Sequence, residues 1–116
     1  MEAREYNDWV VKRAFFNFDV HNLSGASIDK TGVQHDWKQP KDYTIPYGCL
    51  LPENIDRLLL SGRNISGSHL AHSNFRAMPI AMALGEAAGT AAAIAVKENI
   101  SLRDVDVKEI QSEVGE

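Results

Sequence analysis

The chain has 116 residues, with 12 Lys and Arg against 16 Asp and Glu, a formal net charge of −4 and a pI near 5.5. This length allows one small domain with a modest core, and the negative balance excludes a global positive field that would attract nucleic acid or anionic lipid. Apolar residues make up 44% and charged residues 24%, which is typical of an ordinary folded domain and excludes a disordered or fibrous chain. We therefore expect no nucleic-acid partner and no membrane partner.

The cysteine content and the N-terminal residues indicate the cellular compartment in which the chain is expected. Cys49 is the only cysteine, so an intramolecular disulfide and a four-cysteine zinc or iron–sulfur site within the chain are excluded. The N-terminus carries Glu2 and Glu5 and lacks an apolar stretch, so no signal peptide is predicted. We expect a cytoplasmic chain, and the abrupt charged start suits one that begins inside a larger protein.

The first half predicts short elements joined by loops. Residues 7–18 carry several apolar side chains and could form a short helix capped by Asn7 or Asp8, although the spacing also suits a strand. Residues 21–42 are polar and predict a loop or hairpin. Residues 43–47 look extended, with Pro46 restricting them to an edge or a non-strand conformation, and residues 52–56 predict a turn.

The second half gives clearer signals. Residues 58–60 form a short apolar run that predicts a buried parallel strand. A largely polar stretch of about fifteen residues, 63–77, then leads to a helix over 78–98 that opens at Pro79 and ends at Asn99. A last helix begins at Asp106, with Glu109 three residues later as in an acidic capping box and with Ile110 and Val114 on its apolar face. The predicted fold class is α/β.

A donor-rich segment stands out in this acidic chain. Residues 57–85 contain no Asp or Glu, yet they hold Arg63, Arg76, His69, His72 and several serines and asparagines. The segment follows the end of the predicted strand, where open α/β sheets bind ligands, and it enters a helix N-terminus, whose dipole is positive. These features predict an anionic or electron-rich ligand near residues 76–79. The alternative is a solvated loop whose two arginines pair with acids elsewhere.

The long helix carries two apolar stripes. Small side chains recur at Ala81, Gly85, Ala88, Gly89 and Ala92, and larger ones at Ile80, Leu84, Ala87, Ala91 and Ile94. A small face lets another backbone or a flat cofactor approach closely, so we expect this face to be buried. A transmembrane helix with a Gly-x-x-x-Gly contact is the other possibility, but Glu86, Thr90 and Lys97 form a polar third face and favour a core helix packed on a sheet.

Other chemical motifs are weak or absent. His69 and His72 have helical metal-ligand spacing that Asp19 and His21 could complete, but no HExxH pattern exists, and histidines in a loop are more often hydrogen-bond donors; no metal is predicted. Cys49 is either a redox thiol or a small buried hydrophobe. The sequence contains no Gly-x-Ser-x-Gly elbow, no Gly-x-Gly-x-x-Gly and no P-loop.

Four blocks of the sequence carry a family resemblance. They are Tyr-x-Ile-Pro-Tyr-x-Cys-Leu-Leu-Pro at 43–52, Leu-Leu-Ser-Gly-Arg-Asn-Ile-Ser at 59–66, Arg-Ala-Met-Pro at 76–79, and Ala-Leu-Gly-Glu-Ala-Ala-Gly-Thr-Ala-Ala-Ala at 83–93. In this order the blocks resemble the C-terminal end of the FAD-dependent oxidoreductase family, within the glutathione-reductase-like flavoproteins. An Asp-x-His segment at 18–22 and the helix entry at 101–107 resemble the same family.

The resemblance implies a fold and a cofactor. The chain would be a C-terminal fragment of an FAD/NAD(P)-binding Rossmann-like domain, in which residues 57–116 supply a buried strand, a long loop and an Ala/Gly-rich helix. Residues 1–56 would lie on the substrate-domain side. The family's Gly-x-Gly-x-x-Gly unit, which holds the ADP half of FAD, is absent, so the resemblance implies a fragment, a truncated product or one subunit of a split enzyme. Its partners would be the remainder of the FAD-binding domain and an unidentified small-molecule substrate.

The resemblance also assigns roles to residues. The helix N-terminus would face the pyrimidine edge of the flavin, where Arg76 would stabilise negative charge, and the activity would be hydride or electron transfer through the isoalloxazine. The expected cofactor-binding residues are Gly62, Arg63, Ser66, Arg76, Met78, Pro79 and Ile80. The candidates on the substrate side are His21, Cys49 and His72. The competing hypothesis is a non-enzymatic module, without activity of its own, that packs a partner against the Ala/Gly stripe.

Overall fold

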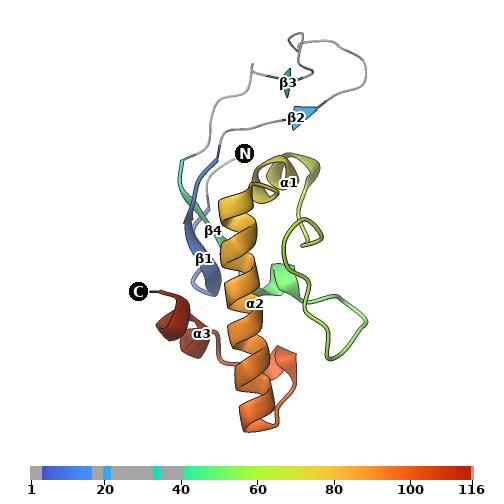
Figure 1. The fold of residues 1–116 in the computed structure, drawn as a ribbon, viewed down its shortest axis with the longest axis vertical. Helices are drawn as coiled ribbons and strands as arrows, with labels where there is room; N and C mark the ends of the chain where they lie inside the picture. The colour runs from blue at the N-terminus through green and yellow to red at the C-terminus, as the bar shows by residue number, and fades with distance from the viewer. Residues whose placement is uncertain (1–3, 17–19, 22–32, 35–40, 116) are drawn as a thin grey trace.

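The structure is a computed structural model that describes residues 4–16, 20–21, 33–34 and 41–115. Two small antiparallel sheets and three α-helices make up its regular structure (Figure 1). The chain order is β1 (Trp9–Ala14), β2 (Val20–His21), β3 (Val33–Gln34), β4 (Tyr43–Pro46), the 3₁₀ turn η1 (Tyr47–Leu50), α1 (His69–Phe75), α2 (Met78–Glu98), the 3₁₀ turn η2 (Leu102–Asp104) and α3 (Val107–Val114).

β1 corrects the prediction of a short helix in this region. The segment pairs antiparallel with β4, placing Val11 opposite Ile45, and the register shifts on both sides of this pair. These irregularities, with a left-handed φ of 55° at Arg13, bury Val10, Val11 and Ala14 together. Buried positions at i, i+1 and i+4 resemble a helical pattern, and this is why the spacing was ambiguous. The extended segment predicted around Pro46 is confirmed as β4.

The polar stretch after β1 contains a second strand pair. Val20 lies opposite Gln34 and His21 opposite Val33, in an antiparallel arrangement. This agrees with the hairpin alternative predicted for residues 21–42. Residues 22–32 and 35–40 lie outside the described residues.

α2 confirms the predicted helix at both ends. Pro79 stands in its first turn, and Asn99 ends the helix with a left-handed φ of 55°. Helices commonly stop at such a residue because the turned backbone closes the last carbonyls. By length and composition α2 could also cross a membrane, a test that core helices of soluble proteins pass too. Here the helix runs along the centre of the structure and packs against β1 and α3 (Figure 1).

The buried face of α2 is not the predicted one. Its buried residues are Ile80, Leu84, Ala87, Ala91 and Ala95. On the small stripe, Gly85 and Gly89 are exposed, and a Cβ added at either would meet no atom within 4 Å. The prediction of a buried small face is therefore wrong for Gly85 and Gly89, whereas Ala88 of the same stripe packs against the core. Ile80 and Leu84 have larger side chains and remove more apolar surface from water than glycine does, so the face that carries them turns toward the core.

The apolar run at residues 58–60 is not the predicted buried parallel strand. Leu58 is 41% exposed, Leu59 and Leu60 are half-buried, and none of the three is in a strand. Its recorded backbone bond runs from the Leu60 N–H to the Leu50 carbonyl (2.8 Å). A buried parallel strand needs neighbouring strands in register, and the described strands form only two antiparallel pairs.

The long connection predicted over residues 63–77 contains a helix of its own. α1 begins after Ser68, whose Oγ accepts the Ala71 N–H (3.2 Å). Only seven residues long, α1 draws its stability from tertiary packing rather than from helix propensity. Phe75 and Asn74 on its inner side are buried. This dependence on distant partners explains why the local pattern did not predict it.

The C-terminal helix follows its prediction. The Asp106 carboxylate accepts the Lys108 N–H (2.9 Å) at the start of α3. Ile110 is fully buried, and Val114 packs against the same core. β1, from the predicted substrate-side part, packs against both α2 and α3, so elements of both parts share one core. The assignment of residues 1–56 and 57–116 to separate domains of a larger enzyme stays a prediction.

Two carboxylates meet where α2 ends and α3 begins. The pKa of Glu109 is raised, first by the negative charge of Glu98 and also by a hydrogen bond with it. A carboxyl with a raised folded-state pKa binds its proton more tightly when folded, so this contribution to stability is lost as pH rises through that pKa. We expect Glu98→Gln to raise the melting temperature by about 1–2 °C at neutral pH.

The gain should vanish near pH 3, which lies below the raised pKa of Glu109, because the protonated Glu109 carboxyl carries no charge for Glu98 to repel. Thermal melts of the parent and the variant at the two pH values check this expectation. Glu5→Gln removes one negative charge elsewhere and serves as the control. An equal gain at both pH values would show that the repulsion between Glu98 and Glu109 is not its cause.

Candidate functional site

The N-terminus of α2 is an open end of a 21-residue helix. Ala77 occupies the N-cap position and gives no side-chain cap, and the first turn holds no acid. Its own N–H donates to the Asn74 carbonyl (3.1 Å), and Pro79 has no N–H. Helix geometry therefore leaves the Met78 and Ile80 N–H groups at the positive end of the dipole. This arrangement suits a negatively charged or electron-rich group.

The predicted cofactor residues at this end differ in exposure. Met78 is 79% exposed and Pro79 is exposed, so both can meet a ligand. Ile80 is 5% exposed, with its side chain in the core, so only its backbone is available. Arg76 is half-buried and forms the joint between α1 and α2, and its N–H donates to the His72 carbonyl (3.3 Å).

The predicted residues at 62–66 form a loop held against α1 and η1. Gly62 has a φ of 83°, a left-handed conformation that glycine adopts without strain. The His72 Nε2–H donates to the Arg63 carbonyl, and the Ser66 N–H donates to the Cys49 carbonyl (3.0 Å). The structure thus joins this loop to Arg76 through His72, one turn of α1.

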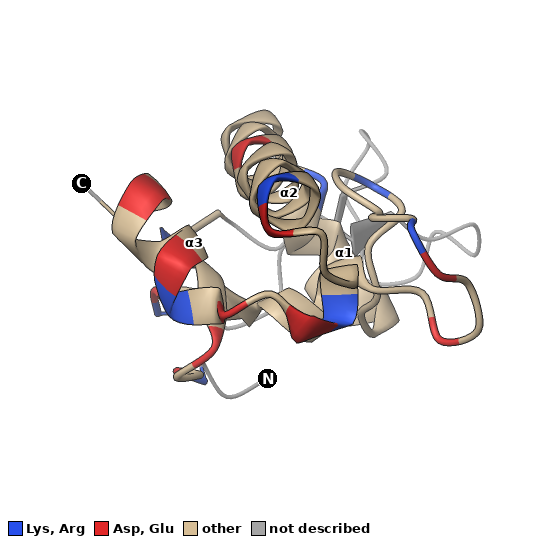
Figure 2. Cartoon of the chain, turned by 90° about the horizontal axis from the view of Figure 1, so that it is seen from below, with Lys and Arg blue, Asp and Glu red and all other residues tan. Residues whose placement is uncertain are grey.

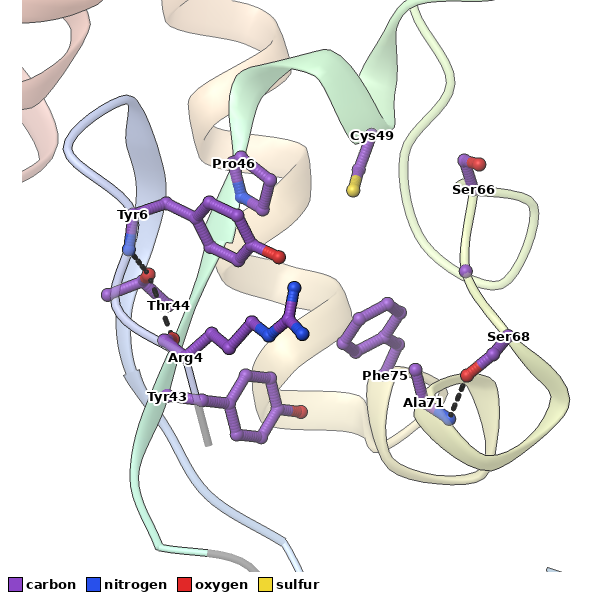
Figure 3. Close-up of a pocket in the computed structure, with 11 residues that line it drawn as sticks. Arg4, Tyr6, Tyr43, Thr44, Pro46, Cys49, Ser66, Ser68, Ala71 and Phe75 are labelled. Carbon is purple, nitrogen blue, oxygen red and sulfur yellow. Dashed lines mark hydrogen bonds between the residues drawn. The ribbon is translucent and has the colours of Figure 1, made fainter. Parts of the chain in front are cut away.

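A cavity of about 360 Å³ lies beside this loop (Figure 3). It is walled by the segment before β1, by β4, by η1, by residues 66–68 and by α1. Of the predicted site residues, the cavity brings together Cys49 and Ser66. The sequence did not indicate the others, because they come from positions up to seventy residues apart. The residues lining the cavity are Arg4, Tyr6, Tyr43, Thr44, Pro46, Cys49, Ser66, Gly67, Ser68, Ala71 and Phe75.

Two titratable groups of the cavity, Cys49 and Tyr43, favour their protonated forms. Burial raises the pKa of the Cys49 thiol, and the negative charge of Asp8 raises it further. Burial also raises the pKa of Tyr43, whose hydroxyl donates to the Asn74 side-chain oxygen. A neutral thiol is a poor nucleophile, so Cys49 stands in the cavity as part of its wall rather than as an activated group.

The histidine candidates do not gather into a metal site. Among the residues that the structure describes, no group of three His, Cys, Asp or Glu is placed to hold a metal ion. His69 is exposed at the start of α1, and His72 is engaged with the Arg63 carbonyl. The backbone of His21 lies in β2, and Asp19 lies outside the described residues.

Comparison with known proteins identifies the chain at the level of the family. The model of the FAD dependent oxidoreductase family matches residues 1–114, nearly the whole chain. No match was found among curated proteins or among solved structures. The family match confirms FAD as the cofactor and indicates a flavin-dependent redox enzyme. The small α/β structure is compatible with part of an FAD-binding domain. The chain therefore belongs to the FAD-dependent oxidoreductase family.

Proposed function

We propose that this chain forms the flavin-facing, C-terminal part of a glutathione-reductase-like FAD oxidoreductase. The observation that supports the proposal is the open N-terminus of α2, with an uncapped Ala77, no acid in the first turn and Arg76 immediately before it. Bound FAD would supply hydride or electron transfer through its isoalloxazine ring. The role of this chain is to place the pyrimidine edge of that ring in the positive potential of the α2 N-terminus and Arg76.

The donors at this end of α2 fit that role. The Met78 and Ile80 N–H groups point along the helix axis, and an electron-rich ring edge can accept from them. Arg76 adds a full positive charge next to the same end. Because reduction adds negative charge at this edge, these groups stabilise the reduced flavin more than the oxidised flavin.

The ADP half of FAD requires a second part of the enzyme. The 116 residues contain no Gly-x-Gly-x-x-Gly loop, so we assign the ADP half to a segment outside them. The exposed face of α2, with Gly85, Gly89 and Met82, would meet the remainder of a Rossmann-like domain. Figure 2 shows that α2 carries few charges, which suits a covered surface. Residues 1–56 would lie on the side of an unidentified small-molecule substrate, in a cytoplasmic enzyme.

Flavin titration of the 116-residue chain tests the proposal. If only the isoalloxazine is contacted, FAD, FMN and riboflavin should bind with similar affinities, each with a dissociation constant above about 1 μM. Quenching of flavin fluorescence measures all three. A submicromolar constant for FAD with a much weaker one for riboflavin would show that this chain binds the ADP half, and the proposal would fail.

Replacing Arg76 tests the electrostatic part of the proposal. Arg76→Ala should lower the midpoint potential of the bound flavin, because the reduced form loses more stabilisation, on the order of 1–3 kcal/mol. Arg76→Lys should recover only part of it, since a point charge cannot replace a two-pronged contact. Redox titration gives the potentials. Lys97→Gln, about 30 Å away at the other end of α2, is the control.

An unchanged midpoint potential together with a lower melting temperature would assign Arg76 to the structure of the joint between α1 and α2. The flavin role of Arg76 would then be refuted.

The exposed small face of α2 also favours a second function, a non-enzymatic module that binds a partner helix. Exposed apolar surface with closely approachable backbone is typical of helix–helix contacts. A colourless and stable dimer, dissociated by Gly89→Leu in analytical ultracentrifugation, would support this function. A monomer that binds flavin would exclude it.

A further inference from the structure

The cavity beside β4 combines a single charge with aromatic walls. Its volume of about 360 Å³ lies in the range of small-ligand sites. Tyr6, Tyr43 and Phe75 line it, and the rings of Tyr43 and Phe75 lie 5.9 Å apart at an angle of 38°. Tilted rings at this spacing form a firm apolar wall against which a flat ring can pack.

Arg4 gives the cavity its charge. Among the described residues that line the cavity, it is the only charged one, and none of them is an acid. In Figure 3 its guanidinium reaches into the cavity between the side chains of Tyr6 and Tyr43. A guanidinium presents a planar fork of N–H donors that matches the two oxygens of a carboxylate.

The backbone around Arg4 is fixed by β4. The Thr44 N–H donates to the Arg4 carbonyl (3.2 Å), and the Thr44 hydroxyl accepts the Tyr6 N–H (2.7 Å). Thr44 is itself only 8% exposed. This double attachment holds Arg4 and Tyr6 at the mouth of the cavity before any ligand arrives, which lowers the entropy cost of binding.

We propose that this cavity binds a small aromatic carboxylate, with its carboxylate on the Arg4 guanidinium and its ring between Tyr6, Tyr43 and Phe75. Burial favours the protonated Cys49 thiol and Tyr43 hydroxyl, so no described lining residue brings a negative charge, and Asp8, whose charge reaches Cys49, lies outside the lining. The site is distinct from the α2 N-terminus and does not require flavin to be bound there.

Calorimetric titration of the 116-residue chain with matched probes tests the proposal. Benzoate should bind at least about tenfold more tightly than benzamide, which lacks the charge, and than acetate, which lacks the ring. Arg4→Gln should weaken benzoate binding about tenfold, and Arg4→Lys should weaken it less. Lys108→Gln removes a positive charge from α3, away from the cavity, and should leave the affinity unchanged.

Circular dichroism of each variant confirms that the fold is retained, and Arg4 is exposed, so its replacement should not unfold the chain. Four results would each overturn the proposal. They are no benzoate binding up to about 10 mM, equal binding of benzamide, equal binding of acetate, and an unchanged affinity in Arg4→Gln. Displacement of benzoate by lumiflavin would also overturn it and assign the cavity to the flavin ring.

Discussion

Replacing Asn74 with Ala should lower the free energy of unfolding by about 2–4 kcal/mol. The side chain is fully buried, its amide nitrogen donates to the Phe16 carbonyl, and its oxygen accepts from the Tyr43 hydroxyl. Removing the amide leaves a hydroxyl and a carbonyl without these partners, and unsatisfied buried groups are costly. Urea unfolding followed by circular dichroism gives the change in free energy.

The neighbouring Ser73 offers a matched control. It is also buried, but its hydroxyl donates to the Leu70 carbonyl (2.7 Å) within the same helix. Ser73→Ala should therefore change stability by no more than about 0.5 kcal/mol. A double-mutant cycle with Tyr43→Phe should give a coupling energy of about 1–3 kcal/mol with Asn74. If Asn74→Ala and Ser73→Ala unfold at the same urea concentration, Asn74 does not join α1 to β4.

Replacing Leu84 with Ala should cost about 2–5 kcal/mol of stability. Leu84 is fully buried on the face that α2 turns toward β1 and α3. Its truncation loses apolar burial and leaves a cavity. Met82, on the same helix, is 74% exposed, so Met82→Ala should change stability by less than about 0.5 kcal/mol. Chemical unfolding of the two variants measures both effects.

Gly85→Leu distinguishes the two faces of α2. A buried small face would be overpacked by leucine, at a cost of about 1–3 kcal/mol. The exposed position in this structure instead predicts no loss, or a gain of up to about 1 kcal/mol, because leucine favours the helix more than glycine does. A clear loss of stability in Gly85→Leu, with none in Met82→Ala, would show that the small face of α2 is buried in the core.

Local signals decided which elements the sequence could predict. α2 was located at both ends because Pro79 and Asn99 act within one turn of the backbone. Asp106 located α3 for the same reason. β1 was ambiguous because its irregular pairing with β4 replaces the alternation of a regular strand. The buried strand at 58–60 was predicted from hydrophobicity alone, and hydrophobicity does not reveal whether neighbouring strands are present.

The candidate site also has one part that local sequence signals predicted and one part that they did not. The α2 N-terminus follows from adjacent residues, so the sequence placed Arg76, Met78 and Pro79 correctly beside it. The cavity instead depends on the approach of Arg4 to β4, forty positions along the chain. No local pattern carries that information. Ser68, whose hydroxyl caps the start of α1, is a local signal that could have located this helix.

The joint between α1 and α2 has a consequence for mutational analysis. Phe75 forms part of the cavity wall and is the last residue of α1, and Arg76 follows it directly. A change in the packing of Phe75 therefore moves the support of the guanidinium that we assign to the flavin. Effects of neighbouring substitutions are not additive when they share such a support. Variants at Phe75 and Arg76 should be measured singly and together, because a ligand-binding defect at one position can originate in the other.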